Sequence, residues 1–133
     1  MTGVVSVRFV SGESERRAPR DWLVFASDFG PVWREDLWRT PASPREYADV
    51  RHAEIQRFAM VELRSVMRER KIRNYELAEL MGVGANMVSD WLTGRRWMTM
   101  ANLLLLESVV GVPVFTAAVA KPSSVRTQNL AVT

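Results

Sequence analysis

The stretch Leu77–Arg96, LAELMGVGANMVSDWLTGRR, interrupts an apolar pattern with small and polar residues at close spacing. Two short segments, Asn74–Met81 and Ala85–Leu92, have the composition and spacing of helices on either side of it. Between them stands Gly82-Val83-Gly84, and a turn this tight needs a residue that tolerates a positive φ, which Gly82 provides. The pattern therefore predicts two helices that are joined by a short turn.

The two predicted helices have apolar residues on facing sides. Ala78 is small enough to let two helix backbones approach closely where they cross. The shared core is expected to consist of Leu77, Met81, Val83, Val88 and Trp91. Two short helices that pack in this way across a tight turn form a helix-turn-helix.

Polar residues of the second helix fall on one side of it. At about 100° per residue, four positions lie within about 140° of arc, and Val88 and Trp91 point the other way. The four positions are Ala85, Asn86, Ser89 and Asp90. The helix therefore has one face for the core and one face for solvent or a partner.

With these features the sequence resembles the Xre/Cro-like helix-turn-helix family of bacterial and phage repressors. The resemblance rests on LAELMGV (Leu77–Val83), on Val88 and Ser89, and on WLTGRR (Trp91–Arg96). Two further stretches are similar to the first and fourth helices of the family, LRSVMRERKI (Leu63–Ile72) and LLLLESVVGVPVF (Leu103–Phe115). The resemblance covers about Glu54–Phe115, a little under half of the chain.

The resemblance implies that the second helix of the motif enters the major groove of duplex DNA with its N-terminal residues facing the bases. Carried over by position, the base-reading residues are Asn86, Ser89, Ala85 and Asp90. Asn86 can bond bidentately to adenine, whereas Ser89 can donate to or accept from several bases. Ala85 could touch only a thymine methyl group. Asp90 repels phosphate, but it could accept from a cytosine amino group or orient a nearby arginine; ordinary solvated surface stays the alternative for Ser89 and Asp90.

A basic cluster surrounds the motif. From Arg64 to Arg96 the sequence has seven basic and four acidic residues, a net charge of +3. The helix N-terminus near Asn74 can present backbone N–H groups to a phosphate. The expected phosphate contacts are Asn74, Arg95, Arg96, Arg73, Lys71 and Arg70. Arg73 departs from the family, which usually has Ser or Thr as the helix cap there, and this departure puts the cap in doubt but not the fold.

The expected fold is mainly α, a bundle of four or five helices that contains the helix-turn-helix at about residues 74–92. Ser43, Pro44 and Glu46 are typical of a capping box at the start of a long helical pattern, which reaches about Arg70 as one helix or two. Further helices are predicted for Met100–Val110 and from Val114. Residues 43–115 are therefore expected to form one helical domain.

The two ends of the chain have weaker patterns. Residues 1–42 are expected to be an N-terminal extension, in which Val4–Val10 alternates like a short strand and could form a β-hairpin with Asp21–Trp33. A helix is the alternative for Asp21–Trp33, because Pro19 precedes the stretch and Gly30-Pro31 could end it. The three tryptophans of this region could pack in the core or form a dimer contact (Trp22, Trp33 and Trp38). Residues 116–133 are expected to be a short helix and a flexible tail, which could also serve as a degradation signal.

Composition excludes several kinds of chemistry. There is no cysteine, so disulfides and thiolate metal sites are excluded, and a zinc site at the single histidine, His52, is not expected. We find no catalytic constellation and expect no enzyme, no cofactor and no small-molecule ligand. No apolar run reaches the length of about 18 residues typical of a membrane span, so we expect a cytoplasmic protein without a membrane partner.

The function predicted from these features is sequence-specific binding of double-stranded DNA to repress transcription by promoter occlusion, as in a temperate-phage immunity repressor. A homodimer would fit the apolar helix that begins at Met100. Two alternatives stay open. One is an antitoxin that binds a partner toxin and its own promoter, and the other is a protein–protein adaptor that has the same helical fold but does not bind DNA.

Overall fold

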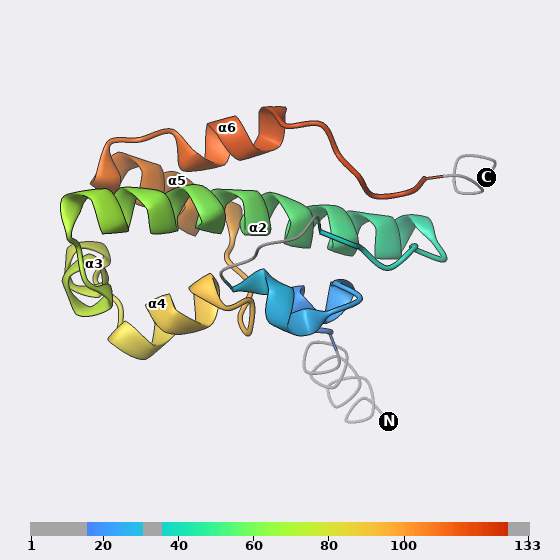
Figure 1. Cartoon of the computed structure of the whole chain (residues 1–133), viewed down its shortest axis with the longest axis horizontal. Helices are drawn as coiled ribbons and strands as arrows, with labels where there is room; N and C mark the ends of the chain where they lie inside the picture. Colours follow the sequence, from blue (N-terminus) through green and yellow to red (C-terminus); the bar gives the residue numbers. More distant parts are fainter. Residues whose placement is uncertain (1–15, 31–35, 128–133) are drawn as a thin grey trace, which may run out of the picture.

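The computed structural model describes residues 16–30 and 36–127 of the chain. Within these ranges the elements are η1 (Pro19–Trp22), η2 (Ala26–Phe29), α2 (Pro44–Arg70), α3 (Asn74–Met81), α4 (Ala85–Leu92), α5 (Met100–Val110) and α6 (Val114–Ala120). Figure 1 shows α2 as the long central helix, with α6 along one side and α4 and the N-terminal segment along the other. The described residues include five α-helices and one isolated β-bridge, which confirms the prediction of a mainly α fold.

The central helix α2 begins at the predicted cap and continues without a break. Ser43 Oγ accepts from the backbone N–H of Glu46 at 3.1 Å, and Pro44 occupies the first helical position. The Glu46 carboxylate accepts from the N–H of Ala42 at 2.9 Å, one residue before the position that a reciprocal capping box would use. The question of one helix or two is resolved, because α2 is a single helix of 27 residues.

The main core lies where α3, α4 and α5 pack against α2. The predicted core of the motif is confirmed, since Leu77, Met81, Val88 and Trp91 are buried and Val83 packs against them. Gly82 has the positive φ that the turn requires, 72°. The helix-turn-helix is therefore formed by residues that were identified from their spacing.

The N-terminal segment differs from the predicted hairpin. The stretch Asp21–Trp33 is not a strand, because its described residues form the two 3₁₀ turns η1 and η2. Leu23 makes an antiparallel bridge with Trp38, and the other proposed strand, Val4–Val10, lies outside the described residues. The reason is burial: Leu23 and Phe29 pack into the same core cluster, and two short turns bring them closer together than an extended strand would.

The tryptophans of this segment pack in the core. Trp22 is buried in a second small cluster with Val50 and Val125, and Trp38 packs against both clusters. This finding favours the core interpretation over a dimer contact for these two residues. Trp33 lies outside the described residues.

The C-terminal segment 121–127 also differs from the prediction of a flexible tail. Ser123 Oγ donates to the fully buried carboxylate of Glu54 at 2.6 Å, and the backbone N–H of Ser124 donates to the same group at 2.8 Å. Val125 is buried beside Val50. These three contacts fasten the segment to α2, so the prediction is wrong for its described part.

Candidate DNA interface

The solvent-facing side of α4 carries the predicted base-reading residues. Ala85 and Asn86 are exposed in the first turn of the helix, and Ser89 and Asp90 are half-buried one turn later. The Asn86 amide has no hydrogen-bond partner among the described residues, so its donors and acceptor are available to a ligand. The opposite face of α4 is buried, as the helical spacing predicts.

Asp90 is paired with both arginines that follow the helix. Its carboxylate lies 3.7 Å from Arg95 Nη1 and 3.4 Å from Arg96 Nη2. Both arginine side chains are 53% exposed, so each pair is weak but orients a guanidinium. Of the two roles expected for Asp90, this geometry favours orienting the arginines over accepting from a base.

The N-terminus of α3 has a carboxylate at its cap. Arg73 has extended backbone angles at the N-cap position, and a guanidinium cannot accept a hydrogen bond from the helix. Instead, Glu76 Oε1 accepts from the N–H of Arg73 at 2.8 Å. Among the described residues, the N–H groups of Asn74 and Tyr75 have no acceptor, and these two remain available to a phosphate.

Two predicted phosphate contacts remain, Lys71 and Arg70. The Lys71 side chain is exposed, whereas the Arg70 side chain is bonded within the fold. Lys71 ends α2 in the left-handed conformation, with φ 58° and ψ 43°, and its side chain is exposed. Arg70 Nη1 donates to the carbonyl of Val110 at 2.6 Å. Arg70 therefore holds the C-terminal end of α5, and the structure does not bring its Nη1 to the solvent face of α4.

A buried polar side chain of α2, missed in the sequence, positions the loop after α4. Gln56 is fully buried; its amide nitrogen donates to the carbonyls of Trp91 (3.2 Å) and Arg96 (3.0 Å), and its oxygen accepts from the N–H of Met98 at 2.8 Å. A glutamine inside a long helix gives no signal of such a role, because its partners are about 35 to 42 residues away.

His52 lies one turn before Gln56 and acts on the same loop. Its Nε2–H donates to the carbonyl of Met98 at 2.8 Å, and its Nδ1 accepts from Arg16 Nη2 at 3.2 Å. Burial, and secondarily the charge of Arg16, lower the pKa of His52. This half-buried histidine is therefore a structural group that holds the loop after α4.

Two more arginines of α2 lie beside the interface and were not singled out from the sequence. Arg64 and Arg68 line a hollow of about 240 Å³ together with Asn74, at the N-terminus of α3. Arg64 Nη2 donates to the carbonyl of Leu92, the last residue of α4, at 2.9 Å. A positive charge at this end of α4 is favourable for the helix dipole. Both arginines add positive potential beside the Asn74 phosphate position.

An exposed helix face that is followed by two exposed arginines, together with free N–H groups at the N-terminus of α3, is suited to contact with the major groove and its phosphates. A family model described as Helix-turn-helix matches residues 63–115, which form less than half of the chain. This part of the chain is therefore similar to the Xre/Cro-like helix-turn-helix domains. Members of this family are DNA-binding regulators of transcription and are generally not enzymes. No curated protein and no solved structure matches the chain significantly.

Two other kinds of site are absent from the described part of the chain. No group of three or more His, Asp or Glu side chains is arranged to hold a metal ion. Each helix is too short or too polar to cross a lipid bilayer.

Proposed function

We propose that this DNA-binding regulator is a sequence-specific repressor that occludes a promoter, in the manner of a temperate-phage immunity repressor. The observation that carries the proposal is the exposed first turn of α4, where Asn86 has no hydrogen-bond partner among the described residues, on a helix that the exposed Arg95 and Arg96 follow. Specific readout of DNA requires a side chain that can bond a base edge. It also requires groups that bind phosphates and so fix the position of the helix.

The base-reading set of the proposal is Asn86, Ser89, Ala85 and Asp90, with Asn86 as the principal reader and Asp90 as an orienting group. The phosphate contacts are Asn74, Arg95, Arg96, Arg73 and Lys71, with Arg70 as the weakest member. Repression would follow from steric exclusion of polymerase from the occupied promoter.

We propose further that the protein binds as a homodimer through α5. Three large apolar side chains of this helix are exposed: Met100 (64%), Leu104 (44%) and Leu105 (43%). Burying such side chains in a symmetric contact is favourable, and a dimer would read two inverted half-sites.

A promoter-position assay tests occlusion directly. A site obtained by binding selection is placed either across the core promoter of a reporter gene or about ten helical turns upstream, with the same spacing phase. Repression only from the overlapping site is expected. Equal repression from both positions, or activation, would contradict occlusion.

A plating assay tests the immunity role. Cells that make the protein should resist lytic growth of a phage that carries the selected site at its early promoter, and a phage with that site scrambled should grow normally. Equal plating of the two phages would contradict immunity by this protein.

A further inference from the structure

Residues 16–30 precede the family domain, yet they lie directly beside the loop that ends its recognition helix. The backbone N–H of Arg20 donates to the carbonyl of Gly94 at 2.9 Å. The indole N–H of Trp97 donates to the carbonyl of Arg17 at 2.7 Å. In Figure 1 this segment and α4 lie on the same side of α2. The surface proposed to face DNA therefore continues onto a part of the chain that the family domain does not include.

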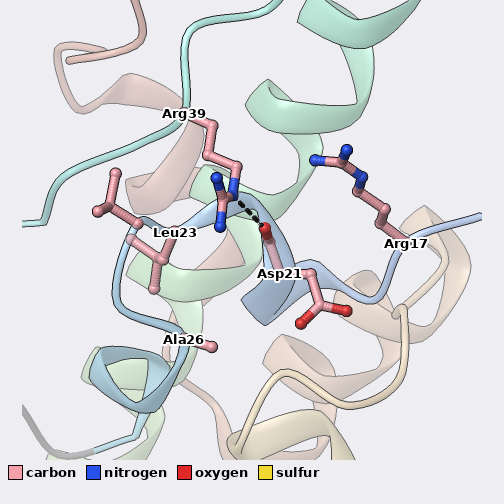
Figure 2. A pocket seen from close by; sticks show the side chains of 6 residues that line it. Arg17, Asp21, Leu23, Ala26 and Arg39 are labelled. Atoms are coloured by element: carbon pink, nitrogen blue, oxygen red, sulfur yellow. Dashed lines mark hydrogen bonds between the residues drawn. The ribbon is translucent and has the colours of Figure 1, made fainter.

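A hollow of about 360 Å³ opens on this segment between two arginines, Arg17 and Arg39 (Figure 2). The rest of its lining is formed by Asp21, Leu23, Val24 and Ala26. Figure 2 shows the guanidinium group of Arg17 extending toward that of Arg39, while the carboxylate of Asp21 points away from Arg39. The opening is therefore lined by two positive charges and one negative charge, with the positive charges on its rim.

Both arginines are held by contacts that leave N–H groups available. Arg39 Nε donates to the carbonyl of Asp21 at 2.9 Å, so both of its terminal nitrogens stay without a partner among the described residues. The guanidinium carbon of Arg17 lies 4.7 Å from the centre of the Trp22 ring, a cation–π contact that uses no N–H group.

The two arginines also lack carboxylate partners within the described residues, in contrast to Arg16, which pairs with Asp49 at 3.1 Å. Preorganised guanidinium groups with free N–H forks are suited to a phosphate, because each can donate two parallel hydrogen bonds to its oxygens. The hollow therefore has the chemistry of a phosphate site.

We propose that Arg17 and Arg39 bind a backbone phosphate of duplex DNA that flanks the site contacted by α4. The proposal rests on the proposed function, since it assigns the N-terminal segment to the same DNA complex. One phosphate neutralised by this pair releases about 0.9 counterions, which corresponds to about a fivefold contribution to affinity at 150 mM monovalent salt.

The test compares the full chain with R17A/R39A by fluorescence anisotropy, on a duplex with a selected site and at least one extra helical turn of flanking DNA. We expect the double variant to bind about fivefold more weakly at 150 mM salt, with the slope of log Kd against log salt reduced by about one. R17K/R39K should recover most of the slope. An unchanged Kd and slope in R17A/R39A would overturn the proposal.

A matched control removes the same charge elsewhere. K121A/R126A takes two exposed positive charges from the C-terminal end of α6 and the segment after it, which lie across α2 from α4 (Figure 1). This variant should keep the wild-type salt slope. An equal loss in both double variants would reduce the effect to net charge and would overturn the assignment to this hollow.

Methylphosphonate scanning distinguishes a DNA phosphate from a free one. Neutralising one flanking phosphate should weaken the wild type and leave R17A/R39A unaffected at that position. If no position behaves in this way, the pair does not bind a backbone phosphate and the proposal is wrong; inorganic phosphate that binds the wild type without displacing the duplex would then identify a free-anion site. Failure of the proposed function would look different, since the wild type itself would then show no preference for the selected duplex.

Discussion

The helix-turn-helix domain, residues 63–115, and the N-terminal segment, residues 16–42, differ in what determines their structure. In the domain, local signals coincide with the observed elements: Gly82 turns the chain with φ 72°, and Thr99 Oγ caps α5 by accepting from the N–H of Asn102 at 3.1 Å. In the described part of the segment, η1 and η2 have no side-chain cap, although Pro19 stands at the start of η1. Its turns are set by contacts to residues far away in sequence, such as the hydrogen bond from Arg20 to Gly94.

This difference teaches that the family domain can be recognised from sequence, while the surface around it cannot. The contact between the two regions is close. A Cβ atom at Gly94 would lie 2.5 Å from Cγ of Phe29, so the ring of the segment rests on the loop that follows the recognition helix. Substitutions confined to one region can therefore test whether the stability of the domain depends on the N-terminal segment.

The largest effect is expected for Gly94→Ala. The substituted residue would have to keep a φ of 74° and would also collide with the Phe29 ring. Strain of about 1 kcal/mol from the left-handed backbone and about 2 kcal/mol from overpacking should lower the free energy of unfolding by about 3 kcal/mol in total, measured by urea titration.

Gly111→Ala is the matched control for Gly94→Ala. Gly111 has a similar φ of 70°, but nothing lies within 4 Å of its added Cβ. This variant should lose only the backbone component, about 1 kcal/mol. Equal losses in the two variants would show that the segment does not press on the domain.

The next largest effect is expected on DNA binding by the exposed face of α4. Asn86→Ala should weaken binding to the selected site by about 1–3 kcal/mol and binding to random duplex DNA very little, because it removes a base contact and no charge. Anisotropy titrations on the two duplexes measure both values.

Arg95→Ala is the contrasting variant for Asn86→Ala. Loss of a phosphate contact should weaken both duplexes alike and lower the salt slope by about one. A loss confined to the selected duplex would mean that Arg95 reads bases, and an equal loss on both duplexes for Asn86→Ala would remove it from the base-reading set.

A pH-dependent effect is expected at the junction of the two regions. His52 is neutral in the fold and accepts from Arg16, and burial lowers its pKa below the ordinary value of 6.5. Below pH 6.5 the unfolded chain therefore takes up a proton that the folded chain resists, and the free energy of unfolding falls, by at most about 1.4 kcal/mol per pH unit. The loss should end once the pH is below the lowered pKa of the folded state.

His52→Gln tests this assignment. Glutamine can still donate to the carbonyl of Met98 but does not titrate, and the chain has no other histidine. Urea titrations at pH 7.0, 6.0 and 5.0 should show a smaller decline for the variant than for the wild type. Parallel curves for the two proteins would rule out His52 as the source.

The smallest effect is expected for Lys71→Gly, within the family domain. Lys71 is the only non-glycine residue with a positive φ among those described, and glycine adopts this conformation without strain. After the greater chain entropy of glycine in the unfolded state is subtracted, the free energy of unfolding should rise by about 0.5 kcal/mol. DNA affinity should fall slightly at the same time, and a rise in both would remove Lys71 from the phosphate contacts.

The helices from Asn74 to Ala120 could be predicted from sequence because local signals mark several of their ends, such as the Thr99 cap of α5 and the glycines that end α3 and α5. The recognition face followed from spacing alone, since Val88 and Trp91 had to be buried and the polar positions had to point away from them. The sequence left two roles open for Asp90, accepting from a base or orienting an arginine. The choice between them depends on the positions of the Arg95 and Arg96 side chains, which the sequence does not give.

The remaining features depend on distant contacts and could not be predicted. Gln56 holds the loop after α4 through partners up to 42 residues away, and nothing in its neighbours marks it. The segment 121–127 has no periodicity, yet it is fastened by the buried carboxylate of Glu54. The predicted hairpin failed for the same reason, because burial of Leu23 and Phe29 against other elements outweighed their strand propensity.

Selection of bound duplexes from a random library by the purified full chain, at near-physiological salt, tests the central claim most directly. The account predicts an enriched motif, and two inverted half-sites about one helical turn apart would also establish the proposed dimer. Salt-sensitive retention of DNA without any enriched motif would contradict sequence-specific recognition by α4.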